Sequence, residues 1–398
     1  MPAFMQKCFK DFKRGAKMKK IAAFLITFII CFNNTGLTAN ADDKPTVSAL
    51  AAVLISADTG EIIYSVNCDK KLPMASTTKI MTTLLLIESG NLDEEFVVDS
   101  EAIKVEGSSM GLVEGDIVTK YALCCGMLLP SGNDAANASA VKIAGSIEAF
   151  AELMNKRAAE IGMTKSFFVT PSGLDGTGHG ASAFDMALLA REALKNDVFR
   201  EICSKETVKL SFGNPPYDRW LKNTNKLLSM YDGVYGVKTG FTDEAGRCLV
   251  SACERDGKNL ICVTLNDKND WQDHIAMYNY GFKQVHMLDY ELPECFSSDV
   301  VGGDVSSINM KSENTIPICT LNLNNEDFSF KVKSAPFLYA PIDEGQQTGT
   351  LEITYKNRSV AETPLFAAQS CEYKKAPKKQ KNLWQKIRDK ICSHKNKS

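Results

Sequence analysis

The order of apolar patterns between residues 51 and 282 constrains the fold more than any other feature of this chain of 398 residues. Residues 51–65 alternate as two strands around Asp58-Thr59-Gly60, and residues 247–254 and 258–265 form a second pair joined through Asp256-Gly257. Both joints are hairpin signals, and residues 234–238 add a further strand pattern. Helical spacing covers residues 76–88, 118–128, 133–145, 147–161, 183–195 and 271–282. We therefore expect an α+β domain whose antiparallel sheet takes strands from both ends of the sequence and is flanked by a helical cluster.

A second, smaller domain is expected after residue 285. Residues 286–373 contain short alternating runs such as Phe328–Val332 and Leu351–Tyr355, with turn residues at Lys356-Asn357. No internal repeat is visible, and the chain length suits more than one domain. The pattern predicts an α+β domain over residues 42–285 and a small all-β domain over residues 286–373.

The formal net charge of −2 conceals a basic segment at each end of the chain. Residues 1–20 carry a net charge of +6 and residues 374–398 carry +9, so residues 42–373 carry −17. A body this acidic lacks the surplus of cations that phosphate contacts require, so we expect no nucleic-acid partner.

The first 41 residues have the parts of a secretory signal. Met18-Lys19-Lys20 precedes an apolar run from Ile21 to Phe32, and the following polar stretch ends in Ala39-Asn40-Ala41. The apolar run is short for a permanent membrane span. We expect residues 1–41 to be a signal peptide and the mature protein to work outside the cytoplasm.

The basic segment 374–398 has the pattern of an amphipathic helix. Leu383, Trp384, Ile387 and Ile391 fall on one narrow stripe of an otherwise cationic helix. Such a helix suits the surface of an anionic membrane, with the tryptophan at the headgroup level. The alternative is a solvated basic tail.

Cysteine and histidine give no indication of a metal site. The chain has 13 Cys and 4 His, but no C-x-x-C pair and no His at the spacing of metal ligands. Most of these cysteines are best interpreted as small buried hydrophobic side chains. We expect neither a metal nor another cofactor.

Three short motifs carry the chemistry, although each alone is weak. They are Ser76-Thr77-Thr78-Lys79, Ser131-Gly132-Asn133 and Lys238-Thr239-Gly240. If Ser76 opens a helix, the Lys79 amine three residues later lies on the same face and can reach the serine hydroxyl. The same spacing occurs in Ser139-Ala140-Val141-Lys142, which we expect on an exposed helix.

Together and in this order, the motifs resemble the Ser-x-x-Lys, Ser-x-Asn and Lys-Thr-Gly set of penicillin-binding proteins and serine β-lactamases. The surrounding residues 73–82, 129–136 and 236–242 are similar to those of the low-molecular-mass penicillin-binding proteins, the serine-type D-alanyl-D-alanine carboxypeptidase family. The resemblance covers residues 45–285, and in architecture it extends to the β-rich domain and the tail. It implies a β-lactamase/transpeptidase-like fold, peptidoglycan stem peptides as substrates and β-lactams as covalent inhibitors.

The resemblance and the chemistry of acyl transfer together suggest roles. Ser76 is the expected nucleophile and Lys79 its base, since burial beside another cation lowers the pKa of a lysine. Ser131 is expected to relay a proton to the leaving amine. The substrate-binding groups are expected to be Asn133, Lys238, Thr239 and Gly240. The family implies an oxyanion hole made by the backbone N–H groups of Ser76 and Phe241.

Two alternative functions remain open at this point, a serine β-lactamase and a non-catalytic wall-binding protein. A scaffold has no need of the serines and lysines of the motifs. Class A β-lactamases place a Glu-x-x-x-Asn pattern between their second and third motifs, whereas the comparable residues 167–173 contain no carboxylate. We expect His179, Asp134 and Asp185 to be structural and Glu61 to be solvated surface.

Overall fold

The computed structural model of the protein describes residues 44–321, 323, 325–374 and 384–388. The chain divides into two units after Pro45, and all the elements below belong to the second unit. The expected signal peptide, residues 1–41, lies outside the described residues. Among the residues that are described, no helix is long and apolar enough to cross a bilayer.

A five-stranded antiparallel sheet in the order β2-β1-β9-β8-β7 forms the centre of the first domain. Its strands are β1 (Ala51–Ser56), β2 (Ile62–Val66), β7 (Val234–Thr242), β8 (Gly246–Arg255) and β9 (Lys258–Leu265). The β8–β9 hairpin turns through Asp256 and Gly257, which both have positive φ (50° and 75°), as a two-residue type I′ turn requires. The sheet therefore takes strands from both ends of the domain sequence, which confirms the prediction.

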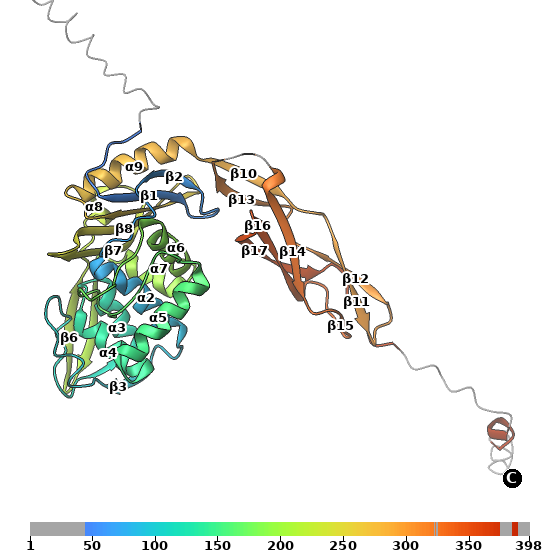
Figure 1. Ribbon diagram of the computed structural model, residues 1–398. Helices are drawn as coiled ribbons and strands as arrows, with labels where there is room; N and C mark the ends of the chain where they lie inside the picture. The colour runs from blue at the N-terminus through green and yellow to red at the C-terminus, as the bar shows by residue number, and fades with distance from the viewer. Residues whose placement is uncertain (1–43, 322, 324, 375–383, 389–398) are drawn as a thin grey trace, which may run out of the picture. The chain divides into compact units, whose positions relative to one another are not determined.

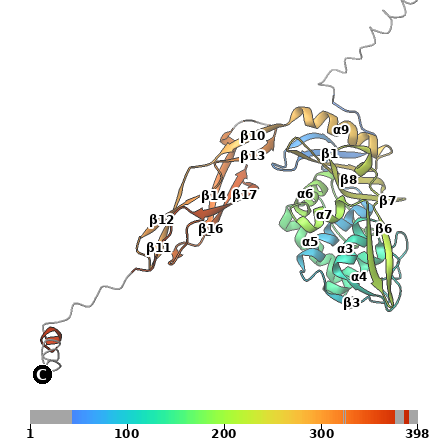
Figure 2. The same cartoon turned by 180° about the vertical axis from the view of Figure 1, so that it is seen from behind.

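Helices cover both faces of this sheet (Figures 1 and 2). Strand β1 is fully buried, and its residues alternate between two apolar cores: Val53 and Ile55 face one, and Ala52 and Leu54 face the other. Helix α9 (Asp270–Gln284) supplies the second core with Met277 and Tyr278. The first core belongs to the helical cluster α2 (Lys79–Glu88), α3 (Lys120–Leu128), α4 (Asn133–Ala144), α5 (Ile147–Ile161), α6 (Ala183–Ala193) and α7 (Asp197–Ser204).

Two antiparallel strand pairs and a short helix complete this domain. Strand β3 (Glu95–Val97) pairs with β4 (Ile117–Thr119), and β5 (Thr207–Gly213) pairs with β6 (Pro216–Lys222). Helix α8 (Leu227–Met230) precedes β7. The sequence patterns did not predict the β5–β6 hairpin.

The C-terminal part is built of strands, as expected. Strands β10 (His286–Glu291) and β13 (Thr315–Thr320) form one pair. A six-stranded sheet follows in the order β14-β16-β17-β12-β11-β15. Its strands are β11 (Phe296–Val301), β12 (Ser307–Lys311), β14 (Phe328–Ser334), β15 (Leu338–Tyr339), β16 (Gln347–Tyr355) and β17 (Arg358–Ala367). The division at residue 285 stays a prediction.

Buried cysteines contribute to these cores. Ten cysteines lie in the part of the chain that the structure describes, and all ten are free thiols. Eight of them are buried, Cys68 is partly exposed and Cys295 is exposed. Burial raises the pKa of the Cys203 and Cys248 thiols to about 12. These thiols therefore act as small apolar side chains, as the sequence indicated.

Candidate active site

The nucleophile candidate Ser76 lies on a tight turn at the start of a buried helix. Residues Ala75–Thr78 form a 3₁₀ turn that runs directly into α2, and Ala75 has a positive φ of 48°. Strand β7 passes against this turn. A Cβ at Gly240 would lie 3.1 Å from the backbone nitrogen of Ser76. The missing side chain of Gly240 therefore lets β7 approach the Ser76 turn, and the expected contact of Gly240 with the substrate stays a prediction.

The Lys79 amine is buried and contacts the Ser76 hydroxyl. Its Nζ lies 2.8 Å from Ser76 Oγ, 2.7 Å from Asn133 Oδ1 and 2.6 Å from the carbonyl oxygen of Ser172. Burial lowers the pKa of Lys79 well below its usual value, the charge of Lys238 lowers it further, and Asp134 partly offsets both effects. A neutral Lys79 keeps two N–H groups for the amide and the carbonyl and directs its lone pair at the serine hydroxyl.

The second motif is held in a strained conformation at the start of α4. Ser131 has a positive φ of 68°, which is costly for a residue with a side chain and is typical of functional sites. Both ends of the Asn133 amide are bonded within the protein, because Oδ1 accepts from Lys79 and Nδ2 donates to the Glu106 carbonyl at 2.6 Å. The structure thus shows Asn133 positioning Lys79, and its contact with substrate stays a prediction.

The expected structural role of Asp134 is clear in the structure. Its carboxylate accepts hydrogen bonds from the backbone N–H groups of Met110, Gly111 and Leu112 at 2.9–3.0 Å, and from the Ser109 hydroxyl at 2.5 Å. The carboxylate therefore fixes the loop that brings Ser108 to the cleft described below.

The third motif places a second buried lysine on the edge strand β7. Lys238 is 1% exposed and its Nζ donates to the Thr239 carbonyl oxygen at 2.8 Å. Burial lowers the pKa of Lys238 to about 7. The Thr239 hydroxyl hydrogen-bonds to the Thr224 hydroxyl at 2.7 Å.

Residues from all three motifs line one cleft of about 440 Å³. They are Ser76, Ser131, Thr239, Gly240 and Phe241, and Phe241 is 63% exposed. Lys79, Asn133 and Lys238 lie beneath this surface as buried groups. The structure therefore brings together every site residue that the sequence predicted.

Seven further lining residues were not predicted: Ser108, Thr224, Lys226, Arg247, Cys248, Asp270 and Trp271. Arg247 faces Phe241 in the β7–β8 register and donates to the buried Asp270 carboxylate at 2.5 Å. Its guanidinium lies 5.5 Å from the centre of the Trp271 ring. Only the register of the β7–β8 hairpin could have pointed to Arg247, because no motif contains it.

Comparison with known proteins agrees with this geometry. The family profile described as D-alanyl-D-alanine carboxypeptidase, the S11 peptidases, matches residues 38–269, which is more than half of the chain. The chain belongs to the S11 D-alanyl-D-alanine carboxypeptidase family. A second profile, the C-terminal domain of penicillin-binding protein 5, matches residues 295–373.

Relatives in this family are similar over most of their length. The D-alanyl-D-alanine carboxypeptidase DacF of Bacillus subtilis is 32% identical over 81% of this chain and 85% of its own length. DacC of Escherichia coli is 31% identical over 87% of this chain and 90% of its own length. Among solved structures, the Streptomyces K15 DD-transpeptidase is 31% identical with a TM-score of 0.58, and it matches 61% of this chain and 99% of its own.

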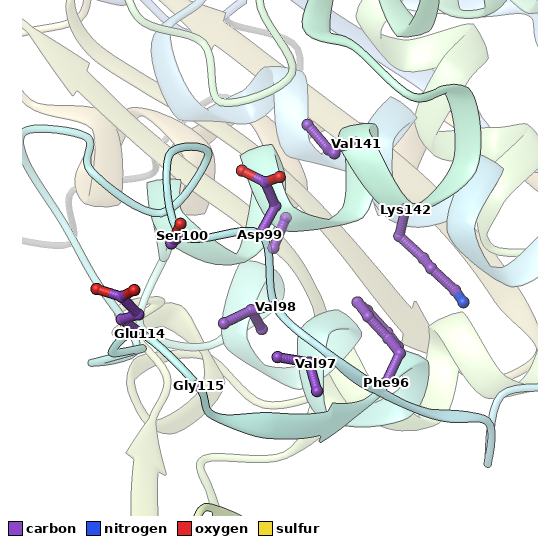
Figure 3. A pocket seen from close by; sticks show the side chains of 10 residues that line it. Phe96, Val97, Val98, Asp99, Ser100, Glu114, Gly115, Val141 and Lys142 are labelled. Carbon is purple, nitrogen blue, oxygen red and sulfur yellow. The ribbon is translucent and has the colours of Figure 1, made fainter.

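The repeated spacing at Ser139 and Lys142 does not form a second S11-type site. Contrary to our expectation of an exposed helix, Ser139 is fully buried and donates to the Ala135 carbonyl oxygen at 2.7 Å. Lys142 instead lines a separate cavity of about 570 Å³ (Figure 3), and its amine lies 4.6 Å from the centre of the Phe96 ring. The Ser139 hydroxyl and the Lys142 amine therefore have different partners and do not form a nucleophile–base pair.

His179 has the structural role that we expected. Its Nδ1 accepts from the Val169 N–H at 3.0 Å, so Nε2 carries the proton and donates to the Thr78 hydroxyl at 3.0 Å. Burial lowers the pKa of His179 to about 4. This neutral histidine supports the turn after Ser76 and makes no hydrogen bond to the serine.

Proposed function

We propose that this chain is a serine D-alanyl-D-alanine carboxypeptidase that removes the terminal D-Ala from peptidoglycan stem pentapeptides through an acyl-enzyme on Ser76. One observation carries the proposal: a fully buried lysine with a lowered pKa lies 2.8 Å from the Ser76 hydroxyl. Serine is a weak nucleophile until a base takes its proton, and Lys79 is placed to be that base.

Acylation follows from this contact. Ser76 Oγ attacks the carbonyl carbon of the penultimate D-Ala while its proton passes to Lys79 Nζ. The backbone N–H groups of Ser76 and Phe241 are the proposed donors to the oxyanion, supported by the close approach of β7 to the Ser76 turn. The C–N bond then breaks, and Ser131 relays the proton held by Lys79 to the amine of the leaving D-Ala, so that Lys79 is neutral again. Hydrolysis of the remaining ester by water releases the shortened peptide.

Recognition of the terminal carboxylate belongs to the cationic and hydroxyl groups around Thr239. Lys238 and Arg247 supply positive charge, and the paired hydroxyls of Thr224 and Thr239 supply donors. The Asp270 carboxylate fixes Arg247 in the cleft. This arrangement favours a substrate that ends in a free carboxylate.

The first prediction tests the nucleophile. Ser76→Ala is expected to abolish covalent labelling by a fluorescent penicillin and the release of D-Ala from a pentapeptide, because the attacking oxygen is removed. The matched control is Ser139→Ala, which leaves the cleft intact and is expected to label at the wild-type rate. Labelling of Ser76→Ala at that rate would exclude Ser76 as the nucleophile.

We also propose that residues 1–41 direct export and that residues 374–398 attach the mature protein to the outer face of the cell membrane. The support lies in the signal-like order of residues 18–41 and in the +9 charge of the tail with its apolar stripe. Residues 384–388 are helical, and Trp384 is 79% exposed. Leu383 and Ile391 lie outside the described residues.

A further inference from the structure

One end of the C-terminal sheet carries apolar side chains that the protein does not cover. They lie on β11, on the following turn, on and before β15, and on the last residues before the tail: Val301 (47% exposed), Val305 (39%), Phe337 (41%), Tyr339 (67%) and Tyr373 (63%). We call these five residues the tip patch. Figure 1 shows β11, β12 and β15 gathered at this end of the domain.

Strand pairing and a ring contact join three residues of the tip patch. Val301 faces Tyr339 in the parallel β11–β15 register, and the Phe337 and Tyr339 rings meet edge to face at 5.4 Å. Their neighbours Val300 and Leu338 point the other way, into the small core with Ile308 and Ile342. The alternation therefore leaves one row of apolar side chains facing solvent.

The basic tail begins at this same patch. Tyr373 forms a bridge with Gly303, and the backbone N–H of Lys374 donates to the Gly302 carbonyl oxygen at 2.9 Å. The proposed membrane-binding segment thus starts within two or three residues of Val301 and Val305 along the paired strands. A tail that lies on a membrane brings the tip patch to the same surface.

We propose that the tip patch inserts into the headgroup region of the membrane beside the tail, an inference that rests on the proposed attachment by the tail. Tyrosine and other aromatic rings suit this region because an apolar body and a polar hydroxyl are both satisfied there. The Asp304 carboxylate lies beside the patch and accepts hydrogen bonds from the Glu372 N–H and the Cys371 thiol. The tail supplies the electrostatic attraction, and the tip patch supplies apolar contact.

The experiment measures partition of the full mature chain, residues 42–398, onto vesicles of equal parts phosphatidylglycerol and phosphatidylcholine. Phe337→Ser combined with Tyr339→Ser is expected to lower the partition coefficient about fivefold or more, since two rings leave the interface. The loss is expected to persist at high salt, where charge is screened. The matched control is Tyr217→Ser with Trp220→Ser, which alters two side chains of similar exposure (57% and 69%) on the β5–β6 hairpin and is expected to change nothing.

The outcomes separate this inference from the proposed tail attachment. Wild-type partition by the tip variant overturns the inference, and a vesicle-dependent loss supports it. A chain ending at Tyr373 tests the tail separately, and undiminished partition of that chain would contradict the tail proposal. If the tip variant changes only the oligomeric state measured without vesicles, the patch is a contact between copies of the chain and the inference is wrong. Penicillin labelling and the melting temperature verify that both double variants are folded.

Discussion

The two buried lysines, Lys79 and Lys238, determine how the site responds to pH. Burial lowers the pKa of Lys79 well below its usual value, and the charge of Lys238 lowers it further, whereas burial lowers the pKa of Lys238 to about 7. Lys79 must be neutral to accept the Ser76 proton, whereas Lys238 must be charged to bind a carboxylate. The proposed mechanism therefore needs the two residues in opposite protonation states.

The second prediction follows from this pair. For a D-Ala-D-Ala peptide, kcat/KM is expected to fall at low pH as Lys79 is protonated. It is also expected to fall above a pH of about 7, because Lys238 in the free enzyme then loses its charge. A bound carboxylate favours charged Lys238, so the alkaline limb of kcat is expected to move to higher pH. Steady-state kinetics at saturating and limiting substrate give both profiles. An alkaline limb at the same pH in both would contradict the assignment.

At the scale of elements, the spacing of apolar residues predicted the helices and strands whose pattern is complete within one segment of the sequence. The helices from α2 to α6, α9, the β8–β9 hairpin and the sheet with strands from both ends all follow from apolar spacing and turn residues. The β5–β6 hairpin was not predicted, although Val208, Leu210 and Phe212 of β5 alternate and pack against the core. Strand β6 gives a weaker signal, because only Arg219 and Leu221 are buried, while Tyr217 and Trp220 remain exposed. Its inward arginine pairs with Asp116, about a hundred residues away in sequence, and no local pattern contains such a contact.

Local sequence patterns do not contain contacts between distant segments, and this also explains which site residues could be predicted. Ser76 and Lys79 lie one helical turn apart, so their contact is local. The Ser172 carbonyl that holds Lys79, and the Arg247 that faces Phe241, reach the cleft only through tertiary packing. Glu61 is a similar case. We expected a solvated side chain, yet its carboxylate is partly buried and accepts from Thr59, Thr320, Tyr355 and the Leu321 N–H at 2.6–3.0 Å.

The third prediction concerns this Glu61 contact between the β1–β2 turn and the C-terminal strands. Burial raises the pKa of Glu61, but the hydrogen bonds from Thr320, Tyr355 and Leu321 outweigh it, so the pKa is lowered. Glu61→Ala leaves these donors unsatisfied and is expected to cost about 2 kcal/mol of unfolding free energy. Denaturant unfolding of both proteins measures the difference.

The pH dependence of this difference serves as its check. Because the folded-state pKa is lowered, the stabilisation is complete above the unfolded value near 4.5 and is lost as pH falls through the folded value. The gap between wild type and Glu61→Ala is therefore expected to narrow in acid. A gap that is absent at neutral pH would mean that the side chain is solvated after all.

The fourth prediction concerns the segment that separates this enzyme from a β-lactamase. Residues 167–173 hold Lys79 through the Ser172 carbonyl and contain no carboxylate to activate water. The one carboxylate among the residues lining the described cleft, Asp270, is paired with Arg247. Penicillin keeps its leaving group tethered, so we expect a long-lived penicilloyl adduct on Ser76, visible as a stable mass increase of the intact protein. Rapid turnover of penicillin would instead favour a β-lactamase.

At the scale of the whole molecule, the proposed chemistry and the proposed membrane attachment belong to different parts of the chain. Every group assigned to the reaction lies between Ser76 and Asp270, and the described cleft has no lining residue beyond Trp271. Residues 42–373 carry a net charge of −17, so an anionic membrane repels this part of the chain. Residues 374–398 carry a net charge of +9, so an anionic membrane attracts them. Removing the tail should therefore change where the enzyme works without changing what it does.

The fifth prediction tests this separation with a chain that ends at Tyr373. Loss of ten basic residues and of the apolar stripe is expected to move most of the protein from the membrane to the soluble fraction, because the remaining tip patch contributes only a several-fold effect. Its rate of penicillin acylation should equal that of the full chain.

Replacing Trp384 and Ile387 by serine in the full chain keeps the charge and removes apolar contact, so this variant should be released by high salt more readily than wild type. Unchanged membrane fractionation of the shortened chain would show that attachment lies elsewhere, and a large fall in its acylation rate would show that the two parts are coupled.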